Sequence, residues 1–383
     1  MTEHFNVIVI GAGVMGSAAA YHLAKDGQRV LLIERFEIAH TLGSSHGESR
    51  IFRFAYNNPD YARLAMQSYP HWRALEADSG EQLLEVVGGL DLAHEPAHHP
   101  DVDAVADALT QVGGRFERLD AAQIGARYPQ WRLGDAAIAV FSPDSGFLRA
   151  TRCVQAMVAQ AAQHGATVRE REAVNVIDPG RPVEVVTDAG RYRADKLIIT
   201  GGAWINELIR YVGLQLPVRI EQEQVTYFAP LRNAERFQRG RFPIFIHWRS
   251  PIPAYGFPMI DKPGVKIGFH HEGYLVDPNA PRMTRDETTQ RVLDYARAHL
   301  PDAAGAPFEP TACLYTTTPD EDFVIDFAPD FDNVVICSAC SGHGFKFGAG
   351  VGRALADLVE HGATEMNIGH VRLRPFAMES PAR

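Results

Sequence analysis

The first 34 residues carry hydrophobic and polar positions in the order strand, turn, helix, strand. Residues 6–10 are almost continuously apolar, as in a strand covered on both faces, and residues 17–24 are mostly small, as in a closely packed helix. Gly27 ends that helix, and the apolar residues 30–33 predict a second strand. This pattern predicts a parallel β-α-β unit at the start of the chain.

Three later segments return to the same α/β pattern. Residues 151–171 predict a helix followed by a strand, and residues 196–200 predict a strand that leads into a glycine turn and another helix. At the C-terminal end, residues 333–336 predict a buried strand, followed by a glycine-rich turn and an amphipathic helix that Gly362 stops. All three returns are expected to join the sheet that the first 34 residues begin.

The segments between these α/β segments have a different pattern of apolar and polar residues. Residues 85–144 mix short strands with one helix, and residues 223–271 alternate as antiparallel strands do. We therefore predict an α/β fold in which a Rossmann-like nucleotide-binding domain is interleaved with a smaller substrate domain on a mainly antiparallel sheet. The predicted boundaries place residues 1–84, 145–222 and 311–383 in the nucleotide-binding domain, and residues 85–144 and 223–310 in the substrate domain.

Composition and charge exclude several classes of partner. The 37 basic and 47 acidic residues give a net charge of −10 without a Lys/Arg-rich stretch, so we expect no nucleic-acid partner. The sequence has no apolar stretch of 18 residues, so we expect no membrane span. The apolar N-terminal run lacks the basic flank of a signal peptide. With only four cysteines, a disulfide framework is not expected, and we predict a cytoplasmic protein.

The turn after the first strand carries a dinucleotide-binding fingerprint, Gly11-x-Gly13-x-x-Gly16. Between a strand and a helix, these glycines let the backbone approach a pyrophosphate, whose charge the helix N-terminus stabilises. Glu34 ends the second strand, where an acid accepts ribose hydroxyls and repels a 2′-phosphate. This pattern predicts FAD or NAD in preference to NADP.

Polar residues elsewhere give candidate chemistry that is less specific. In residues 265–271, alternation puts Lys266 and His270 on one strand face, and from this strand alone we predict a solvated polar face. Arg50 and Arg53 follow a turn and form a pair suited to a carboxylate or to a solvated surface. A CxxC pair at Cys337 has no second such pair, so we predict packing there and no metal site in the chain.

Several motifs, in order along nearly the whole chain, resemble the monomeric sarcosine oxidase and N-methyltryptophan oxidase family of FAD-dependent amine oxidases. Beyond the glycine fingerprint, they are His40-Thr-x-Gly-Ser44, Gly47-x-x-Arg50-Ile-x-Arg53-x-Ala-Tyr56, Tyr255-Gly-Phe-Pro258, Lys266-Ile-Gly-Phe-His270, Cys313-Leu-Tyr-Thr316 and Ser341-Gly-His-Gly-Phe-Lys346. The resemblance implies FAD joined covalently through a thioether to Cys313.

The resemblance also implies roles for the matching residues. Arg53 and Lys346 would bind the substrate carboxylate, and Lys266 would assist the reaction with oxygen near the flavin ring. His46 and Arg50 would lie close to that ring. Tyr255, Tyr315 and His270 would line the substrate cavity, although packing alone is an equal alternative for His270. Further contacts with FAD are implied for Arg35, Ser44, Val174, Gly202, Trp204, Gly342, Gly344 and Phe345.

The activity that the resemblance implies is oxidation of a secondary, N-methyl amino acid to an imine. Water would hydrolyse the imine to an amine and an aldehyde, and O2 would be reduced to hydrogen peroxide. We expect a monomer with a small amino-acid substrate. Which secondary amine is preferred stays open, because Phe54 and Ile246-His-Trp248 depart from the sarcosine-specific pattern. The alternatives are an oxidase of a cyclic amine such as pipecolate, an NAD-dependent dehydrogenase and a non-catalytic flavin protein.

Overall fold

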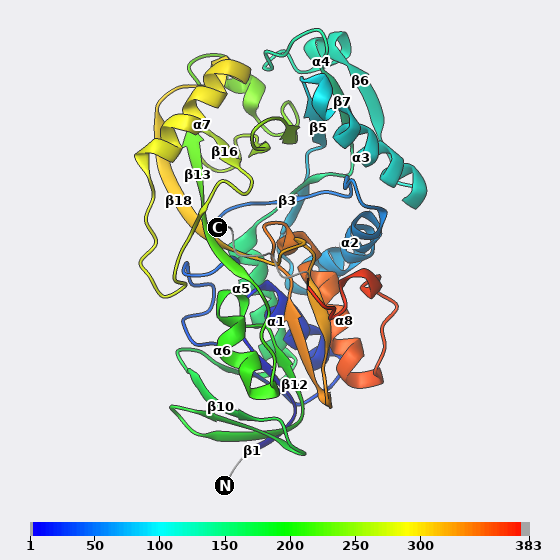
Figure 1. The fold of residues 1–383 in the computed structure, drawn as a ribbon, viewed down its shortest axis with the longest axis vertical. Helices are drawn as coiled ribbons and strands as arrows, with labels where there is room; N and C mark the ends of the chain where they lie inside the picture. The colour runs from blue at the N-terminus through cyan, green and yellow to red at the C-terminus, as the bar shows by residue number, and fades with distance from the viewer. Residues whose placement is uncertain (1–2, 377–383) are drawn as a thin grey trace.

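The computed structural model describes residues 3–376 and arranges them around two large sheets (Figure 1). The eight-stranded sheet lies in the lower half of Figure 1, in the order β10-β11-β12-β1-β2-β9, with β20 beside β12 and β19 beside β20. The strands that form it are β1 (Glu3–Ile10), β2 (Val30–Ile33), β9 (Thr167–Arg169), β10 (Val174–Asp178), β11 (Val183–Thr187), β12 (Arg191–Ile199), β19 (Val324–Ala328) and β20 (Phe331–Ser338).

The centre of this sheet is parallel and buried on both faces. Strand β1 pairs in parallel with β2 and β12, and β12 pairs in parallel with β20. Alternate residues of β1 enter different cores: Val7 and Val9 pack in one, and Ile8 and Ile10 in the other. The helices that contribute to these cores are α1 (Val14–Lys25), α2 (Pro59–Ser79), α3 (His99–Val112), α5 (Ala150–Gln163) and α8 (Gly348–His361) in the first and α6 (Ile205–Ile209) in the second. Covered faces explain the continuous apolar runs of these strands.

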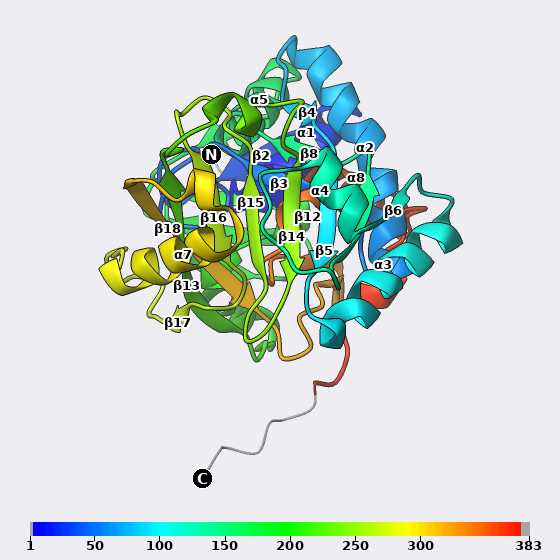
Figure 2. The ribbon, with the colours of Figure 1, turned by 90° about the horizontal axis from the view of Figure 1, so that it is seen from above.

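A nine-stranded sheet forms the upper half of the molecule. Its order is β17-β13-β16-β15-β14-β5-β7-β6, with β18 on the other side of β13. The strands are β5 (Gly89–Ala93), β6 (Glu117–Asp120), β7 (Ile138–Ser142), β13 (Arg219–Phe228), β14 (Ile244–Trp248), β15 (Ala254–Phe257), β16 (Val265–Phe269), β17 (Tyr274–Leu275) and β18 (Pro307–Thr317). All its pairs are antiparallel except β14 with β5, which lie side by side in Figure 2 and join two segments far apart in sequence.

Helices and one small sheet complete the architecture. The upper half also contains α3 (His99–Val112), α4 (Ala121–Arg127) and α7 (Asp286–His299) (Figure 1). A three-stranded antiparallel sheet of β3 (Arg50–Phe52), β8 (Gly146–Leu148) and β4 (Leu84–Val86) includes Arg50. Among residues 3–376, none of the helices combines the length and apolar character that a membrane span requires.

The returns predicted from the sequence are confirmed, because β9, β12 and β20 all belong to the sheet that β1 begins. The details differ at the ends of elements: α1 starts at Val14, three residues before the expected start, because the glycine turn already leads into the helix. The domain boundaries stay a prediction. Strands β13 and β18 both continue across them, at residues 222 and 310.

Candidate active site

One cavity of about 940 Å³ brings together the residues that the sequence singled out. Its wall includes segments from both large sheets and from the loop between β2 and β3. Every candidate site residue except Gly16 lines it. Local motifs from distant parts of the chain therefore meet at one place.

The turn with Gly11, Gly13 and Gly16, called the glycine cradle here, packs so closely that a side chain at Gly11 or Gly16 would collide with neighbouring backbone. Gly11 has φ +95°, and a Cβ atom there would lie 2.5 Å from the carbonyl oxygen of Thr200. A Cβ atom on Gly16 would lie 1.9 Å from the carbonyl oxygen of Gly11, so Gly16 lets α1 approach β1 without facing the cavity itself. Gly13 lines the cavity directly before α1, whose N-terminus favours negative charge.

Glu34 stands at the end of β2 beside this cradle. Its buried carboxylate accepts hydrogen bonds from the backbone N–H groups of Ala12 at 2.7 Å and Phe36 at 3.0 Å. Each carboxylate oxygen keeps a further acceptor site, which ribose hydroxyls can use. The cavity continues past Arg35, Val174, Gly202 and Trp204, as expected for the nucleotide end. The Arg35 guanidinium lies 5.9 Å from the Trp204 ring and pairs with Glu207.

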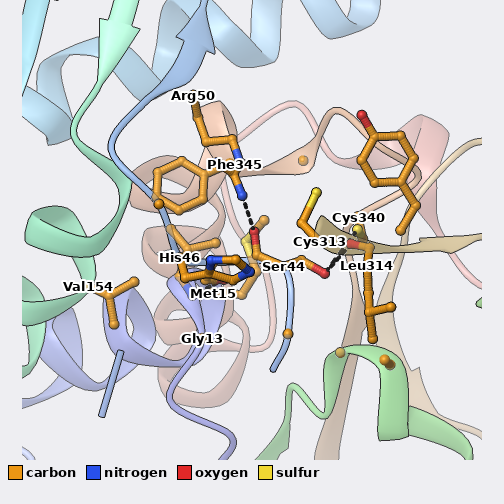
Figure 3. A pocket seen from close by; sticks show the side chains of 18 of the residues that line it. Gly13, Met15, Ser44, His46, Arg50, Val154, Cys313, Leu314, Cys340 and Phe345 are labelled. Atoms are coloured by element: carbon orange, nitrogen blue, oxygen red, sulfur yellow. Dashed lines mark hydrogen bonds between the residues drawn. The ribbon is translucent and has the colours of Figure 1, made fainter. Parts of the chain in front are cut away.

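Cys313 lies in β18 and lines the same cavity. Its thiol is free, and its cross-strand neighbour is Glu223, whose carboxyl has its pKa raised to about 7 by burial. Burial raises the pKa of the Cys313 thiol, and the nearby charges of Arg50 and Lys266 lower it in part. The Ser44 hydroxyl donates to the Leu314 carbonyl at 2.6 Å, which ties the loop after β2 to β18 beside the cysteine (Figure 3).

Arg50 and His46 belong to the same loop. Arg50 donates to the carbonyl oxygens of Ser44 and Ser49, both at 3.1 Å, and the first of these bonds is visible in Figure 3. Burial, together with the nearby charge of Arg50, lowers the pKa of His46 to about 3, so the imidazole is neutral at pH 7. Its Nε2 atom is buried without a hydrogen-bond partner among residues 3–376. A buried, unpaired polar atom beside a large cavity indicates that a ligand supplies the partner.

The prediction that Lys266 lies on a solvated face is wrong. Lys266 is 5% exposed, and its ammonium donates to the carbonyl and hydroxyl oxygens of Ser49 at 3.1 and 3.2 Å. Burial lowers its pKa to about 7, and the like charge of Arg50 contributes to the decrease. The other face of β16, with Val265, Ile267 and Phe269, packs in a hydrophobic core. Alternation was correct, but both faces of the strand are covered.

Arg53 and Lys346 are both buried at the cavity wall, each with a fixed set of partners. Arg53 pairs with the buried carboxylate of Asp91 at 2.7 Å. Lys346 donates to the Tyr56 hydroxyl at 2.7 Å and to the His343 carbonyl oxygen at 2.6 Å. Burial lowers the pKa of Lys346 well below its ordinary value, and the charge of Arg53 adds to this effect. Arg53 and Lys346 meet at the Tyr56 ring, since the Arg53 guanidinium lies 4.5 Å and the Lys346 ammonium 5.2 Å from its centroid.

Aromatic rings and one histidine complete the wall. Tyr255, Tyr315 and His270 line the cavity, and the Tyr315 hydroxyl lies 3.5 Å from His270 Nδ1. Burial lowers the pKa of His270 well below its ordinary value, with His271 contributing, so this imidazole is neutral at pH 7. Gly342, Gly344 and Phe345 line the cavity just before α8.

The sequence did not predict that Asp91 and Tyr56 contact the two buried cations of the cavity wall, Arg53 and Lys346. Asp91 interrupts the apolar strand β5 and is 1% exposed, and burial raises the pKa of its carboxyl while Arg53 opposes that rise. A lone acid between Leu90 and Leu92 is a readable sign of a buried partner, but it does not identify that partner. Tyr56 was quoted only as part of a motif. Its hydroxyl holds Lys346 in place.

A family model described as FAD dependent oxidoreductase matches residues 6–358. The chain belongs to this FAD-dependent oxidoreductase family. The oxidoreductase is 35% identical to human peroxisomal sarcosine oxidase over 92% of both chains. It is 32% identical to N-methyl-L-tryptophan oxidase of Yersinia pestis, over 97% of this chain and 99% of the relative. The family resemblance inferred from the motifs is thereby confirmed.

Among solved structures, the oxidoreductase is similar to the open form of NikD, an unusual amino acid oxidase essential for nikkomycin biosynthesis. The TM-score is 0.86 at 27% sequence identity, and the match covers 99% of this chain and 100% of NikD. The predicted fold class is confirmed by this match. The cavity of this oxidoreductase also fits FAD, because the glycine cradle, Glu34 and the unpaired His46 nitrogen line one continuous space.

Proposed function

We propose that this oxidoreductase oxidises the carbon–nitrogen bond of a secondary, N-methyl amino acid and reduces O2 to hydrogen peroxide. The observation that carries the proposal is the buried pair Arg53 and Lys346, which faces the same cavity as the glycine cradle and Cys313. Two buried cations beside a single carboxylate, Asp91, leave one positive charge for a substrate carboxylate once Lys346 is protonated. The relatives named for sarcosine and N-methyltryptophan support the same substrate class.

In this proposal, Arg53 and Lys346 bind the substrate carboxylate and so orient the amine. Asp91 and Tyr56 hold the two cations in position before substrate arrives, which lowers the entropic cost of binding. Because burial and Arg53 lower the pKa of Lys346, an arriving carboxylate raises that pKa again and favours the ammonium form. Arg53 and Lys346 form a carboxylate clamp, and the substrate itself completes this clamp by favouring the protonated form of Lys346.

The same environment prepares the amine for oxidation. A buried site lined by cations lowers the pKa of a bound amine, so the nitrogen keeps its lone pair. Bound FAD supplies a hydride acceptor for the adjacent carbon–hydrogen bond. The resulting imine takes up water and releases the amino acid and, from an N-methyl group, formaldehyde. With O2 as the final acceptor, one substrate, one O2 and one water give one amine, one formaldehyde and one hydrogen peroxide.

Lys266 serves the reaction with oxygen. Its ammonium is fixed by Ser49 at the cavity wall, and a fixed cation stabilises the negative charge that develops on O2 as it accepts an electron. With a pKa of about 7, Lys266 is only half protonated at neutral pH. The rate of this step is therefore expected to depend on pH near neutrality.

We also propose that Cys313 holds FAD covalently through a thioether to the 8α-methyl group. The thiol is free and lies at the cavity wall, and the charges of Arg50 and Lys266 offset part of the rise in its pKa that burial causes. His46 and Arg50 place a neutral donor or acceptor and a positive charge beside the flavin ring. Gly342 to Phe345 lead into α8, whose N-terminus favours negative charge on that ring.

The remaining expectations belong to the same proposal. The protein acts as a monomer in the cytoplasm, where its three other cysteines, Cys153, Cys337 and Cys340, stay reduced. The two predicted domains correspond to FAD binding and substrate binding.

A substrate screen tests the proposal. Purified protein is incubated in air with sarcosine, N-methyltryptophan, pipecolate and the matching primary amino acids, and peroxide and formaldehyde are both measured. We expect peroxide and an equal amount of formaldehyde with sarcosine or N-methyltryptophan, whereas peroxide from pipecolate alone would indicate an oxidase of cyclic amines instead. Peroxide from primary amino acids alone, or from none of these compounds, contradicts the proposal.

A further inference from the structure

Three histidines meet behind the sheet that forms the substrate wall. His94 directly follows β5, His247 lies in β14, and His299 is the last residue of α7. One ring nitrogen of each lies within 4.8 Å of those of the other two, and His94 Nδ1 is 2.7 Å from His247 Nε2. None of the three lines the large cavity. The cluster therefore has no part in the chemistry proposed above.

The contact between His94 Nδ1 and His247 Nε2 identifies one lone pair in the cluster, because one of these two nitrogens must accept the hydrogen bond that the other donates. A neutral imidazole that turns such a lone pair toward an ion is the form of histidine that binds metals.

The partners of these rings resemble the outer shell of a metal site. His247 Nδ1 lies 2.9 Å from the Tyr295 hydroxyl, and His94 Nε2 lies 3.6 Å from the carboxylate of Glu95. Metal-bound histidines usually donate their other N–H to such an oxygen, which fixes the ring and the lone pair that faces the metal. His299 Nδ1 is buried and has no hydrogen-bond partner among residues 3–376. That nitrogen is satisfied if it binds an ion.

A second cavity of about 300 Å³ borders His299 and Tyr295. It offers an entry path and room for a water molecule as a fourth ligand. Arg249 and Arg291 also line this cavity, and Arg291 pairs with Glu272 there. The remaining charge of Arg249 opposes a divalent ion, so we expect weaker affinity than three histidines without such a neighbour would give.

We propose that His94, His247 and His299 bind one zinc ion, which ties β5, β14 and α7 together. Three imidazole nitrogens with an open fourth position suit Zn²⁺ among the common divalent ions. Two nitrogens on a tetrahedral zinc lie about 3.3 Å apart, so the 2.7 Å pair opens by several tenths of an ångström, and the ring that donates in this contact moves its proton to its other nitrogen and stays neutral. Because Ile246 and Trp248 line the substrate cavity on either side of His247, bound zinc would steady the cavity wall from behind.

Metal analysis of the holoenzyme tests this site. Untagged protein is freed of metal with a chelator, dialysed against zinc and analysed for zinc per chain. We expect one zinc in the unmodified protein and none in the double variant His94→Gln/His299→Gln. His98→Gln is the matched control, since this nearby ring already bonds to Asp101 and Ser250, and it should keep the zinc. Flavin content and thermal unfolding show whether each variant is folded.

Two further variants make the result specific. Tyr295→Phe removes only the hydroxyl beside His247, so zinc affinity should fall about 10- to 100-fold while one zinc still binds at saturation. His271→Gln tests the other group of possible ligands, Glu221, Glu223 and His271, and should leave binding unchanged. The proposal is overturned if the unmodified protein retains no zinc, if the double variant retains it, or if His271→Gln is the change that removes it.

Discussion

Replacing Lys266 by Met separates the reaction with oxygen from the reaction with substrate. Met has nearly the length of Lys and suits a residue that is 5% exposed in β16. The change removes two hydrogen bonds to Ser49, each worth about 1 kcal/mol. It also removes an ammonium whose burial is unfavourable, as its pKa of about 7 against an ordinary 10.5 indicates. The variant is therefore expected to fold.

The size of the kinetic effect follows from the position of the charge. Deleting one preorganised group that stabilises a developing anion slows a reaction about 10²- to 10³-fold. At pH 7 about half of the molecules carry the Lys266 ammonium, because its pKa is about 7. This halves the rate that full protonation would give, which is small beside the effect of deletion. We expect oxygen to react at least about 10²-fold more slowly with Lys266→Met.

The pH dependence has a defined sign. As pH rises through about 7, Lys266 loses its proton, so the oxygen reaction of the unmodified protein should slow about tenfold for each further pH unit. The Lys266→Met variant should lack this dependence. Stability changes in the opposite sense. Between pH 7 and 10.5 the unfolded chain binds the Lys266 proton more tightly than the folded chain does. Raising the pH in this range therefore increases the free energy of unfolding of the unmodified protein relative to that of Lys266→Met.

Stopped-flow absorbance measures the two half-reactions separately. Protein and substrate are first mixed without oxygen, and the substrate-reduced protein is then mixed with oxygenated buffer at several pH values. Lys262→Met is the matched control: Lys262 lines the same cavity, but its ammonium already pairs with Glu48 at 2.9 Å and with Glu309. The control should react with oxygen within a few-fold of the unmodified protein. Equal losses in both half-reactions of Lys266→Met, or an unchanged pH profile, would refute a specific role in the oxygen reaction.

Substitutions at three further residues test the cofactor link and the carboxylate clamp. Acid precipitation should leave the yellow colour in the protein pellet, and Cys313→Ala should release it to the supernatant; free FAD from the unmodified protein speaks against a covalent bond. Arg53→Ala should weaken binding of substrate and of inert carboxylates by about 1.5–3 kcal/mol, and Arg53→Lys should not restore it fully, since an ammonium lacks the planar two-donor fork. An unchanged KM after Arg53→Ala excludes the clamp. Asp91→Asn keeps an acceptor for Arg53 but removes the negative charge that compensates it. The free energy of unfolding should therefore fall by a few kcal/mol, while inert carboxylates bind more tightly. Weaker carboxylate binding with unchanged stability would contradict this role of Asp91.

The sequence predicted the parts of the fold that depend on local patterns. The parallel strands and their helices show period and length within one segment, and the glycine fingerprint adds Glu34 at a fixed distance. Alternation in β16 correctly put Lys266 and His270 on one side. It did not show what covers that side, because the Lys266 partner, Ser49, lies 217 residues away. The polar face was therefore predicted as solvated when it is buried.

Pairing between distant residues is what sequence patterns did not supply. Asp91 is a visible exception in an apolar strand, but only the fold places it against Arg53. The histidine cluster has no such local sign, since His94 and His247 lie 153 residues apart and meet through the parallel pairing of β5 and β14. Motif spacing finds ligands that share one turn or helix. It does not find ligands that come from separate strands.

Anaerobic reduction of the bound flavin by matched amines tests the central claim most directly. An N-methyl amino acid and the same amine without its carboxylate are each mixed with the protein in the absence of oxygen, and the loss of flavin colour is followed. The clamp of Arg53 and Lys346 predicts rapid bleaching by the amino acid and a kcat/KM lower by at least about tenfold for the amine without a carboxylate, since 1.4 kcal/mol or more of binding is lost. Comparable bleaching by the two compounds would contradict the assignment to amino-acid oxidation, and no bleaching by either would contradict amine oxidation altogether.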